Sequence, residues 1–151
     1  MPLLTFPTPK HDPRFSPPNR FGIPDDIYIG IVTAIQLINQ AAIELFDDAP
    51  TISANASLGS NFYITLTANI AMNAPINPSD WQVIRFYITQ DAVGSRTLSW
   101  DSIFRFSTDI PAPTLTTTPE FSDYVEFMYN PTYQTWDCTR VIKGFDTTTP
   151  P

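Results

Sequence analysis

Hydrophobic residues between positions 81 and 106 fall on every second place in two short runs, which is the period of a half-buried strand. The first run covers residues 84–88, a polar bend with one glycine follows over residues 90–96, and the alternation resumes at Leu98 and Trp100. This pattern predicts a β-hairpin with a loop longer than two residues. Its apolar face is expected to be buried.

Similar runs recur along most of the chain after Thr51, separated by turn-forming residues. The further runs that we predict to be strands lie at residues 52–58, 62–70, 114–118, 124–129 and 136–142. Residues 130–134 connect the last two runs, which predicts a second hairpin. Short strands at intervals of about 8–12 residues are typical of β-sandwiches and jelly rolls. The chain is therefore predicted to be mainly β, with a single antiparallel sandwich or jelly-roll-like domain over residues 51–145 and a frayed tail over residues 146–151.

Residues 25–50 have a different pattern, which predicts one helix and a linker. Asp25 can cap the helix, and apolar residues recur at three- and four-residue spacings through residues 33–45. We expect at least residues 33–45 to be helical, ending before Pro50. The alternative is a strand over residues 27–32 and a shorter helix, because β-branched residues crowd there.

Residues 1–24 contain seven prolines and no sustained periodicity, so we expect an extended arm. Apolar side chains are interspersed among the prolines, and a freely solvated linker would not need them. Apolar side chains on a stiff backbone can enter pockets on a neighbouring protein at a reduced entropic cost. The alternative is that the arm folds back over its own domain. The arm residues that we predict to contact a partner are Leu4, Phe6, Arg14, Phe15, Arg20 and Phe21.

The formal net charge is −7, but the arm and the body differ in sign. Residues 1–24 carry three basic side chains and one acidic side chain, which leaves five of the eight basic and fourteen of the fifteen acidic residues in the rest of the chain. An acidic body disfavours nucleic-acid binding, because phosphates require a positive face. No apolar run approaches the ~20 residues that span a bilayer, and the first residues lack a signal-peptide pattern. We therefore expect no membrane partner. Only 15% of residues are charged, as expected where much of the surface meets another protein.

Residue types that carry chemistry are sparse. His11, the only histidine, lies in the arm, where no rigid frame would hold it. Cys138, the only cysteine, lies two residues after Trp136 and is predicted to be a small buried hydrophobe. The acidic residues do not have the spacing of a calcium loop, and phosphate-loop, nucleophile-elbow and metalloprotease motifs are missing. We expect no catalytic residues, no metal site and no cofactor.

Residues 51–145 resemble a family of tailed-bacteriophage virion structural proteins. The resemblance is clearest in residues 90–100, QDAVGSRTLSW, and includes the earlier string ITLTAN at residues 64–69. The strings FRF, PTLTTT and WDC follow in the family's order. Two positions depart from the family pattern: Ile70 stands where a basic residue is expected, and Trp81 where glycine is common.

The resemblance implies a β-rich, usually trimeric unit without catalytic activity. Such modules occur in capsid decoration or cement proteins and inside tail-fibre and tail-tip proteins. The short arm, in place of shaft repeats, leads us to expect a capsid decoration protein, homotrimeric and seated on the virion surface after synthesis in the cytoplasm of the host bacterium. Its partner would be the major capsid protein, whose neighbouring subunits it would clamp. The alternative is a tail-fibre or tail-tip module that binds host surface glycan through exposed aromatics, although two of the three tryptophans fall on predicted core faces.

Overall fold

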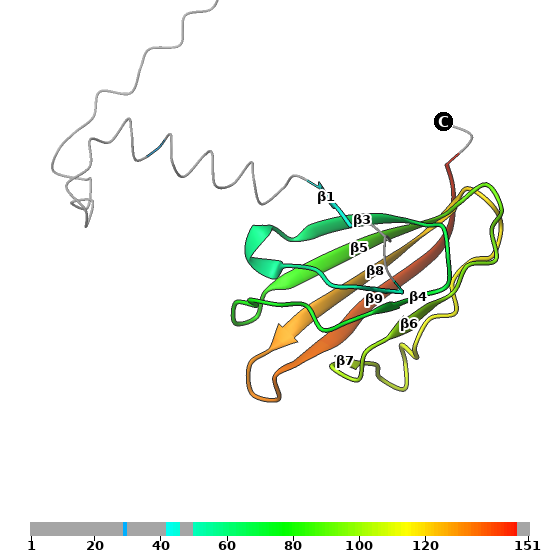
Figure 1. The fold of residues 1–151 in the computed structure, drawn as a ribbon. Helices are drawn as coiled ribbons and strands as arrows, with labels where there is room; N and C mark the ends of the chain where they lie inside the picture. The colour runs from blue at the N-terminus through cyan, green and yellow to red at the C-terminus, as the bar shows by residue number, and fades with distance from the viewer. Residues whose placement is uncertain (1–28, 30–41, 46–49, 148–151) are drawn as a thin grey trace, which may run out of the picture. The chain divides into compact units, whose positions relative to one another are not determined.

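The structure is a computed structural model that describes Ile29, residues 42–45 and residues 50–147 (Figure 1). The chain divides into two compact units, Met1–Ile35 and Gln36–Pro151, and all the described strands belong to the second. In the first unit Ile29 is helical and exposed. The predicted arm and most of the predicted helix lie outside the described residues.

The described part of the second unit is mainly β and forms two sheets. The strands of the larger sheet, in spatial order, are β1 (Ala42–Glu44), β3 (Asn61–Leu66), β5 (Val83–Gln90), β8 (Phe121–Asn130), β9 (Thr135–Asp146) and β7 (Phe104–Arg105). The strands of the smaller sheet are β2 (Thr51–Ile52), β4 (Ile70–Met72) and β6 (Leu98–Trp100). A short 3-10 helix, η1 (Ala56–Leu58), connects β2 to β3. This arrangement confirms the predicted mainly β, sandwich-like fold.

The chain crosses from one sheet to the other with each successive strand from β1 to β7 (Figure 1). Consecutive strands of one sheet therefore run in the same direction, so β1, β3 and β5 are parallel, as are β2, β4 and β6. The β8–β9 hairpin lies between β5 and β7 and supplies both antiparallel pairings. The expectation of an antiparallel domain was wrong for the other pairings. Parallel strands need a crossover connection, and here a strand of the opposite sheet provides it.

The predicted hairpin over residues 81–106 was wrong in its pairing. Its alternation is confirmed, since Ile84, Phe86 and Ile88 are all buried. However, β5 and β6 lie in different sheets, and β5 pairs with β3 and β8 instead. A seven-residue connection fits a crossover between sheets as well as a hairpin loop, so the pattern could not distinguish the two.

Three further predictions about local structure were corrected. Residues 52–58 are not one strand, because β2 ends at Ile52 and η1 follows at Ala56–Leu58. Residues 114–118 are not a strand, since they form no described ladder. The predicted helix does not extend through residues 42–44, which pair with β3 as β1. Apolar residues in a short segment satisfy helix and strand periods equally, and pairing with the sheet edge decides between them.

The second hairpin is confirmed, with β8 and β9 joined by the turn at residues 131–134. Trp136 and Cys138 are both buried, as their shared face predicted. β9 continues to Asp146, which pairs with Phe121, so the strand enters the segment that was expected to be frayed. The β domain also begins earlier than expected, because β1 lies before residue 50.

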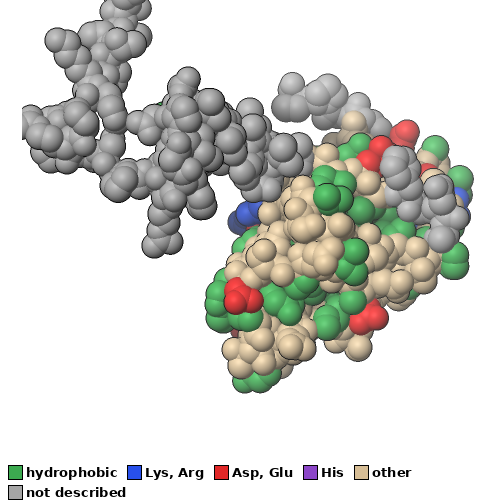
Figure 2. All heavy atoms as spheres, turned by 60° about the vertical axis from the view of Figure 1, so that its left-hand side comes forward, with side chains coloured by type: hydrophobic (Ala, Val, Ile, Leu, Met, Phe, Trp, Pro, Cys, Tyr) green, Lys and Arg blue, Asp and Glu red, His purple; other side chains and the backbone are tan. Residues whose placement is uncertain are grey.

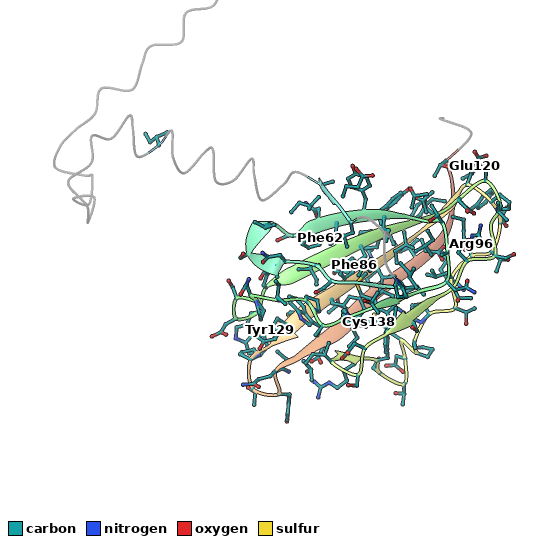
Figure 3. The ribbon with its side chains drawn as sticks, in the orientation of Figure 1. Phe62, Phe86, Arg96, Glu120, Tyr129 and Cys138 are labelled. Carbon is teal, nitrogen blue, oxygen red and sulfur yellow. The ribbon has the colours of Figure 1, made fainter. Side chains whose placement is uncertain are left out.

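The core between the two sheets is rich in aromatic rings (Figure 3). The ring of Phe127 lies 4.7 Å from Phe104 and 5.2 Å from Trp100, measured between centroids. Phe86 stacks on Phe62 at 5.7 Å and meets Phe127 edge-on at 6.1 Å. Such pairs contribute about 0.5–1.5 kcal/mol each beyond the burial of their area. Trp100, from the smaller sheet, packs against three rings of the larger sheet and so joins the two sheets.

Candidate interaction surface

The six residues predicted to contact a partner, from Leu4 to Phe21, lie outside the described part of the chain. Within the described part, the outer face of the larger sheet presents a surface with a defined chemistry. Its side chains alternate with those of the core, so the strand register determines which of them are neighbours.

Three tyrosines form a row across this outer face. Tyr63 in β3 is in register with Tyr87 in β5, which is in register with Tyr124 in β8. The row ends at Ile142 in β9. Neighbouring strands are about 4.8 Å apart, so the three tyrosines span about 10 Å. We call these four residues the tyrosine row.

Strand alternation directs the tyrosines outward. Phe62 and Phe86, the residues before Tyr63 and Tyr87, are buried, whereas the two tyrosines are 37% and 38% exposed. Phe145, also exposed, lies 6.2 Å from the Tyr87 ring between centroids and widens the aromatic surface. Sequence reasoning missed this row as a site. Its signal was that tyrosines occupy the outward positions of three different strands, but their alignment depends on the register.

A polar cluster beside the row is centred on Glu126. The Arg85 guanidinium lies 3.0 Å from its carboxylate, and the Tyr124 hydroxyl donates a hydrogen bond of 2.9 Å to it. The Thr139 hydroxyl donates a third hydrogen bond of 2.9 Å. The cluster fixes the hydroxyl end of Tyr124 and neutralises one charge of each sign. The outer face therefore offers rings and hydroxyl groups in defined positions with little net charge.

Burial alone would raise the pKa of Glu126, but hydrogen bonds from Tyr124, Thr139 and Arg85 outweigh it and hold the pKa below its ordinary value of 4.5. Asp137 behaves similarly: burial raises its pKa, but the hydrogen bonds led by that of Arg105 lower it below 3.8. Both carboxylates are thus more acidic in the folded protein than in the unfolded chain.

This difference makes stability depend on pH on the acid side. A carboxylate with a lowered pKa contributes its full stabilisation above the unfolded pKa and loses it as the pH falls through the folded pKa. We therefore expect the melting temperature to begin to fall as the pH drops below the ordinary glutamate value of 4.5. Thermal melts across the acid range should show a shallower fall for Glu126→Gln. An unchanged acid dependence in that variant would assign the effect to other carboxylates.

The motif of residues 90–100 forms the connection from β5 to β6. Asp91 accepts hydrogen bonds from the backbone of Val93 and Gly94 and pairs with Arg96 at 2.8 Å. Gln90 is buried and holds the backbone of Arg96 from both sides, accepting from its N–H at 2.8 Å and donating to its carbonyl at 3.0 Å. The charged and amide residues of the motif therefore serve the fold. They shape a crossover between the two sheets.

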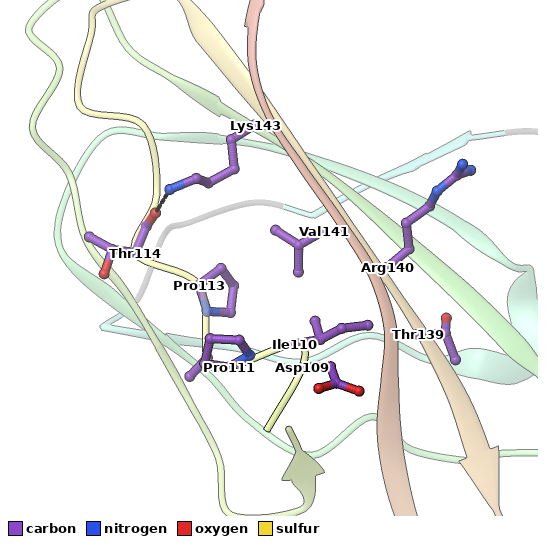
Figure 4. Close-up of a pocket in the computed structure, with 10 residues that line it drawn as sticks. Asp109, Ile110, Pro111, Pro113, Thr114, Thr139, Arg140, Val141 and Lys143 are labelled. Atoms are coloured by element: carbon purple, nitrogen blue, oxygen red, sulfur yellow. Dashed lines mark hydrogen bonds between the residues drawn. The ribbon is translucent and has the colours of Figure 1, made fainter. Parts of the chain in front are cut away.

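A groove of about 530 Å³ lies between residues 109–114 and β9 (Figure 4). Ile110, Pro111, Pro113 and Val141 give it apolar walls, and the Lys143 ammonium donates a hydrogen bond of 3.0 Å to a loop carbonyl at its edge. It has the chemistry to hold an apolar side chain. Sequence reasoning placed only a loop here.

Groups suited to catalysis or metal binding are sparse in this fold. Within residues 42–45 and 50–147 together with Ile29, no cluster of three or more His, Cys, Asp or Glu side chains is arranged to hold a metal ion. Cys138 is buried, as predicted, and burial raises the pKa of its thiol. No helix in the described ranges has the length and hydropathy of a membrane span.

No family model matches the chain, and no match to it was found among curated proteins or solved structures.

Proposed function

We propose that this chain is a non-enzymatic virion structural protein of a tailed bacteriophage, and specifically a capsid decoration protein that clamps neighbouring major capsid subunits. The resemblance of residues 51–145 to that family supports the proposal. The observation that carries it is the tyrosine row on the outer face of the larger sheet, where the neighbouring Arg85 and Glu126 are paired with each other. Protein interfaces are enriched in tyrosine and depleted of unpaired charge, and the row has that composition.

The basic, proline-rich arm supplies the second contact in this proposal. Residues 1–24 differ in charge sign from the body, and their apolar side chains suit pockets on an adjacent subunit. A partner held by both the sheet face and the arm binds at a high effective concentration, so weak contacts combine into a durable attachment. In a homotrimer three arms would act together. The arm contacts would be made by Leu4, Phe6, Arg14, Phe15, Arg20 and Phe21.

Deletion of residues 2–24 tests the role of the arm. We expect the truncated chain to bind capsids at least ten-fold more weakly than the full chain, because the linked contact is lost. The measurement is co-sedimentation with particles assembled without this protein. As a control, the melting temperature of the truncated chain should match that of the full chain. A lower melting temperature would favour an arm that folds over its own domain, and unchanged binding would refute the arm contact.

Quantifying the protein in purified virions tests the assignment to the capsid. A decoration protein should be present in many copies distributed over the shell. A tail protein would be present in a few copies at one vertex. Absence from purified virions would refute both.

The alternative function is a tail-fibre or tail-tip module that binds host surface glycan. The tyrosine row also supports this, since the exposed rings of Tyr63 and Tyr87, in line with the half-buried Tyr124, can stack on sugar faces. Binding of host-cell polysaccharide that is lost in Tyr87→Ser would favour it. Because the row is also the proposed capsid contact, weaker capsid binding in that same variant would favour the decoration function instead.

A further inference from the structure

The end of the domain at which β5 begins carries an exposed apolar cluster that the tyrosine row does not include. Its members are Leu58, Ile76 and Trp81, which are 54%, 52% and 57% exposed. Figure 2 turns this end towards the viewer, and hydrophobic side chains gather over it. We call these three residues the loop-end patch.

Two loops carry the patch, and hydrogen bonds tie them together. The backbone N–H of Ala56 donates to the carbonyl of Ile76 at 2.9 Å. The Gln82 amide donates to the carbonyl of Ala56 at 2.7 Å and to that of Gly59 at 3.4 Å. Leu58 and Trp81, which are sequence neighbours of these residues, are therefore held at the same end of the domain. The patch is preorganised and loses little conformational entropy when it binds.

Several polar side chains of these loops form hydrogen bonds within the loops. The Asn55 side-chain oxygen accepts hydrogen bonds from the Ser57 hydroxyl at 2.8 Å and from the Asn77 amide at 3.2 Å. The Gln82 oxygen accepts from the backbone of Ser79 at 3.0 Å. Residues 55–61 and 73–82 contain one charged side chain, Asp80. The patch thus presents apolar groups with almost no charge around them.

Trp81 adopts a backbone conformation that a bulky side chain disfavours. Its φ of 59° is in the left-handed region, which glycine adopts without steric cost and which is strained for a bulky residue. Strain of this kind costs on the order of 1–3 kcal/mol and is concentrated at functional positions. The strained residue is also large, aromatic and exposed, so its side chain does not repay the cost by filling the core. A role outside the fold accounts for both observations.

We infer that the loop-end patch inserts Trp81 into an uncharged apolar pocket on a partner protein. Tryptophan is among the residues that contribute most to protein interfaces, and aliphatic neighbours such as Leu58 and Ile76 complete the desolvated centre of a contact. Sugar binding is less suited to this patch, because the Asn55 and Gln82 side chains are engaged within the loops and aliphatic groups do not stack on sugar faces. The inference rests on the proposed function for the identity of the partner, the capsid subunit.

The test is co-sedimentation of the full chain with particles assembled without this protein. We expect Trp81→Gly to bind roughly 30-fold more weakly than the wild type, as for an interface residue of this class. Because glycine relieves the backbone strain, the variant should fold at least as stably, and lost binding cannot then be attributed to unfolding. Trp81→Phe should recover part of the binding. Val93→Ser, at a 69% exposed residue beyond the far end of β5, is the matched control and should bind as the wild type does.

Different failures have different meanings. If the wild-type chain does not bind particles, the proposed function fails and the inferred partner fails with it. If the wild type binds and Trp81→Gly binds equally well, only the inference about the patch is overturned. The inference is also overturned if Trp81→Gly loses only the binding of host polysaccharide, because a glycan then occupies the patch. It is likewise overturned if sedimentation shows that the substitution dissociates an oligomer, because a second copy of the chain then occupies the patch.

Discussion

Replacing Gly94 with alanine is expected to destabilise the domain by roughly 3 kcal/mol or more, enough to remove much of the stability of a domain this size. A Cβ at this position would lie 2.6 Å from the carbonyl oxygen of Thr117 and 2.9 Å from the Pro119 ring. The φ of 72° adds a conformational penalty for any side chain. The carbonyl of Thr117 also accepts a hydrogen bond of 2.9 Å from the backbone of Ser95, so moving either segment breaks it.

Gly144 provides a matched control for this prediction. Its φ is 81°, but a Cβ there would meet only the Thr116 hydroxyl, at an ordinary distance of 3.9 Å. Gly144→Ala is therefore expected to cost only about 1 kcal/mol, the penalty for the backbone conformation alone. Denaturant unfolding of both variants measures the difference. Equal losses of unfolding free energy in the two variants would show that the close contact of residues 117–119 with Gly94 does not exclude a side chain there.

Truncating Phe127 to alanine is expected to cost about 3–5 kcal/mol, as for other large aromatic residues removed from a packed core. Phe127 is fully buried in β8 and contacts the rings of Phe86, Trp100, Phe104 and Phe106. These rings come from both sheets and from the loop that follows β7. Removing the central ring leaves a cavity that the surrounding strands cannot close, because their backbones are held by the ladders on either side.

Two variants separate packing at Phe127 from a general effect of losing an aromatic ring. Phe127→Leu preserves most of the volume and should cost less than the alanine variant. Phe145→Ala removes an exposed ring from the same sheet and should change the free energy of unfolding by about 0.5 kcal/mol or less. Chemical denaturation with a common slope for all variants gives the comparison. A loss at Phe145 as large as that at Phe127 would contradict the assignment of the core.

Trp100 was predicted to lie on a buried face, and it is partly buried against the core. Its indole packs among the core rings, as its place in the alternation indicated. However, its N–H has no hydrogen-bond partner in the structure of residues 50–147. A buried unsatisfied donor reduces stability, so the ring must contribute enough packing to offset it. No sequence pattern indicates such a deficit, because it depends on which backbone carbonyls surround the ring.

The candidate site was only partly accessible from the sequence. Each of Tyr63, Tyr87 and Tyr124 occupies an outward position that alternation alone identifies. Their alignment into a row depends on β3 lying beside β5, and β5 beside β8, in one particular register. A shift of one strand by two residues would keep every side chain on its face, but the three tyrosines would no longer be neighbours.

The loop-end patch could not be recognised as a binding surface from the sequence alone. Trp81 was recognised as a departure from a position where the resembling family has glycine. Only the backbone dihedral shows why glycine suits that position, and only the exposed area shows that the tryptophan side chain is not used in the core. The backbone strain and the exposure of Trp81 together indicate a role in binding, and both come from the structure.

The sequence by itself determined which residues of β3, β5 and β8 face the core, that Trp136 and Cys138 share a buried face, and that β8 and β9 form a hairpin. These features follow from period-two alternation and from a short turn, both of which act over neighbouring residues. Tertiary structure decided that successive strands cross between two sheets, that most of them pair in parallel, and that residues 42–44 join a sheet edge. The physical reason is that alternation specifies a face but not a partner. Partners are selected by ladders and packing between residues far apart in the chain, and the free energy of these contacts is not encoded in any local pattern.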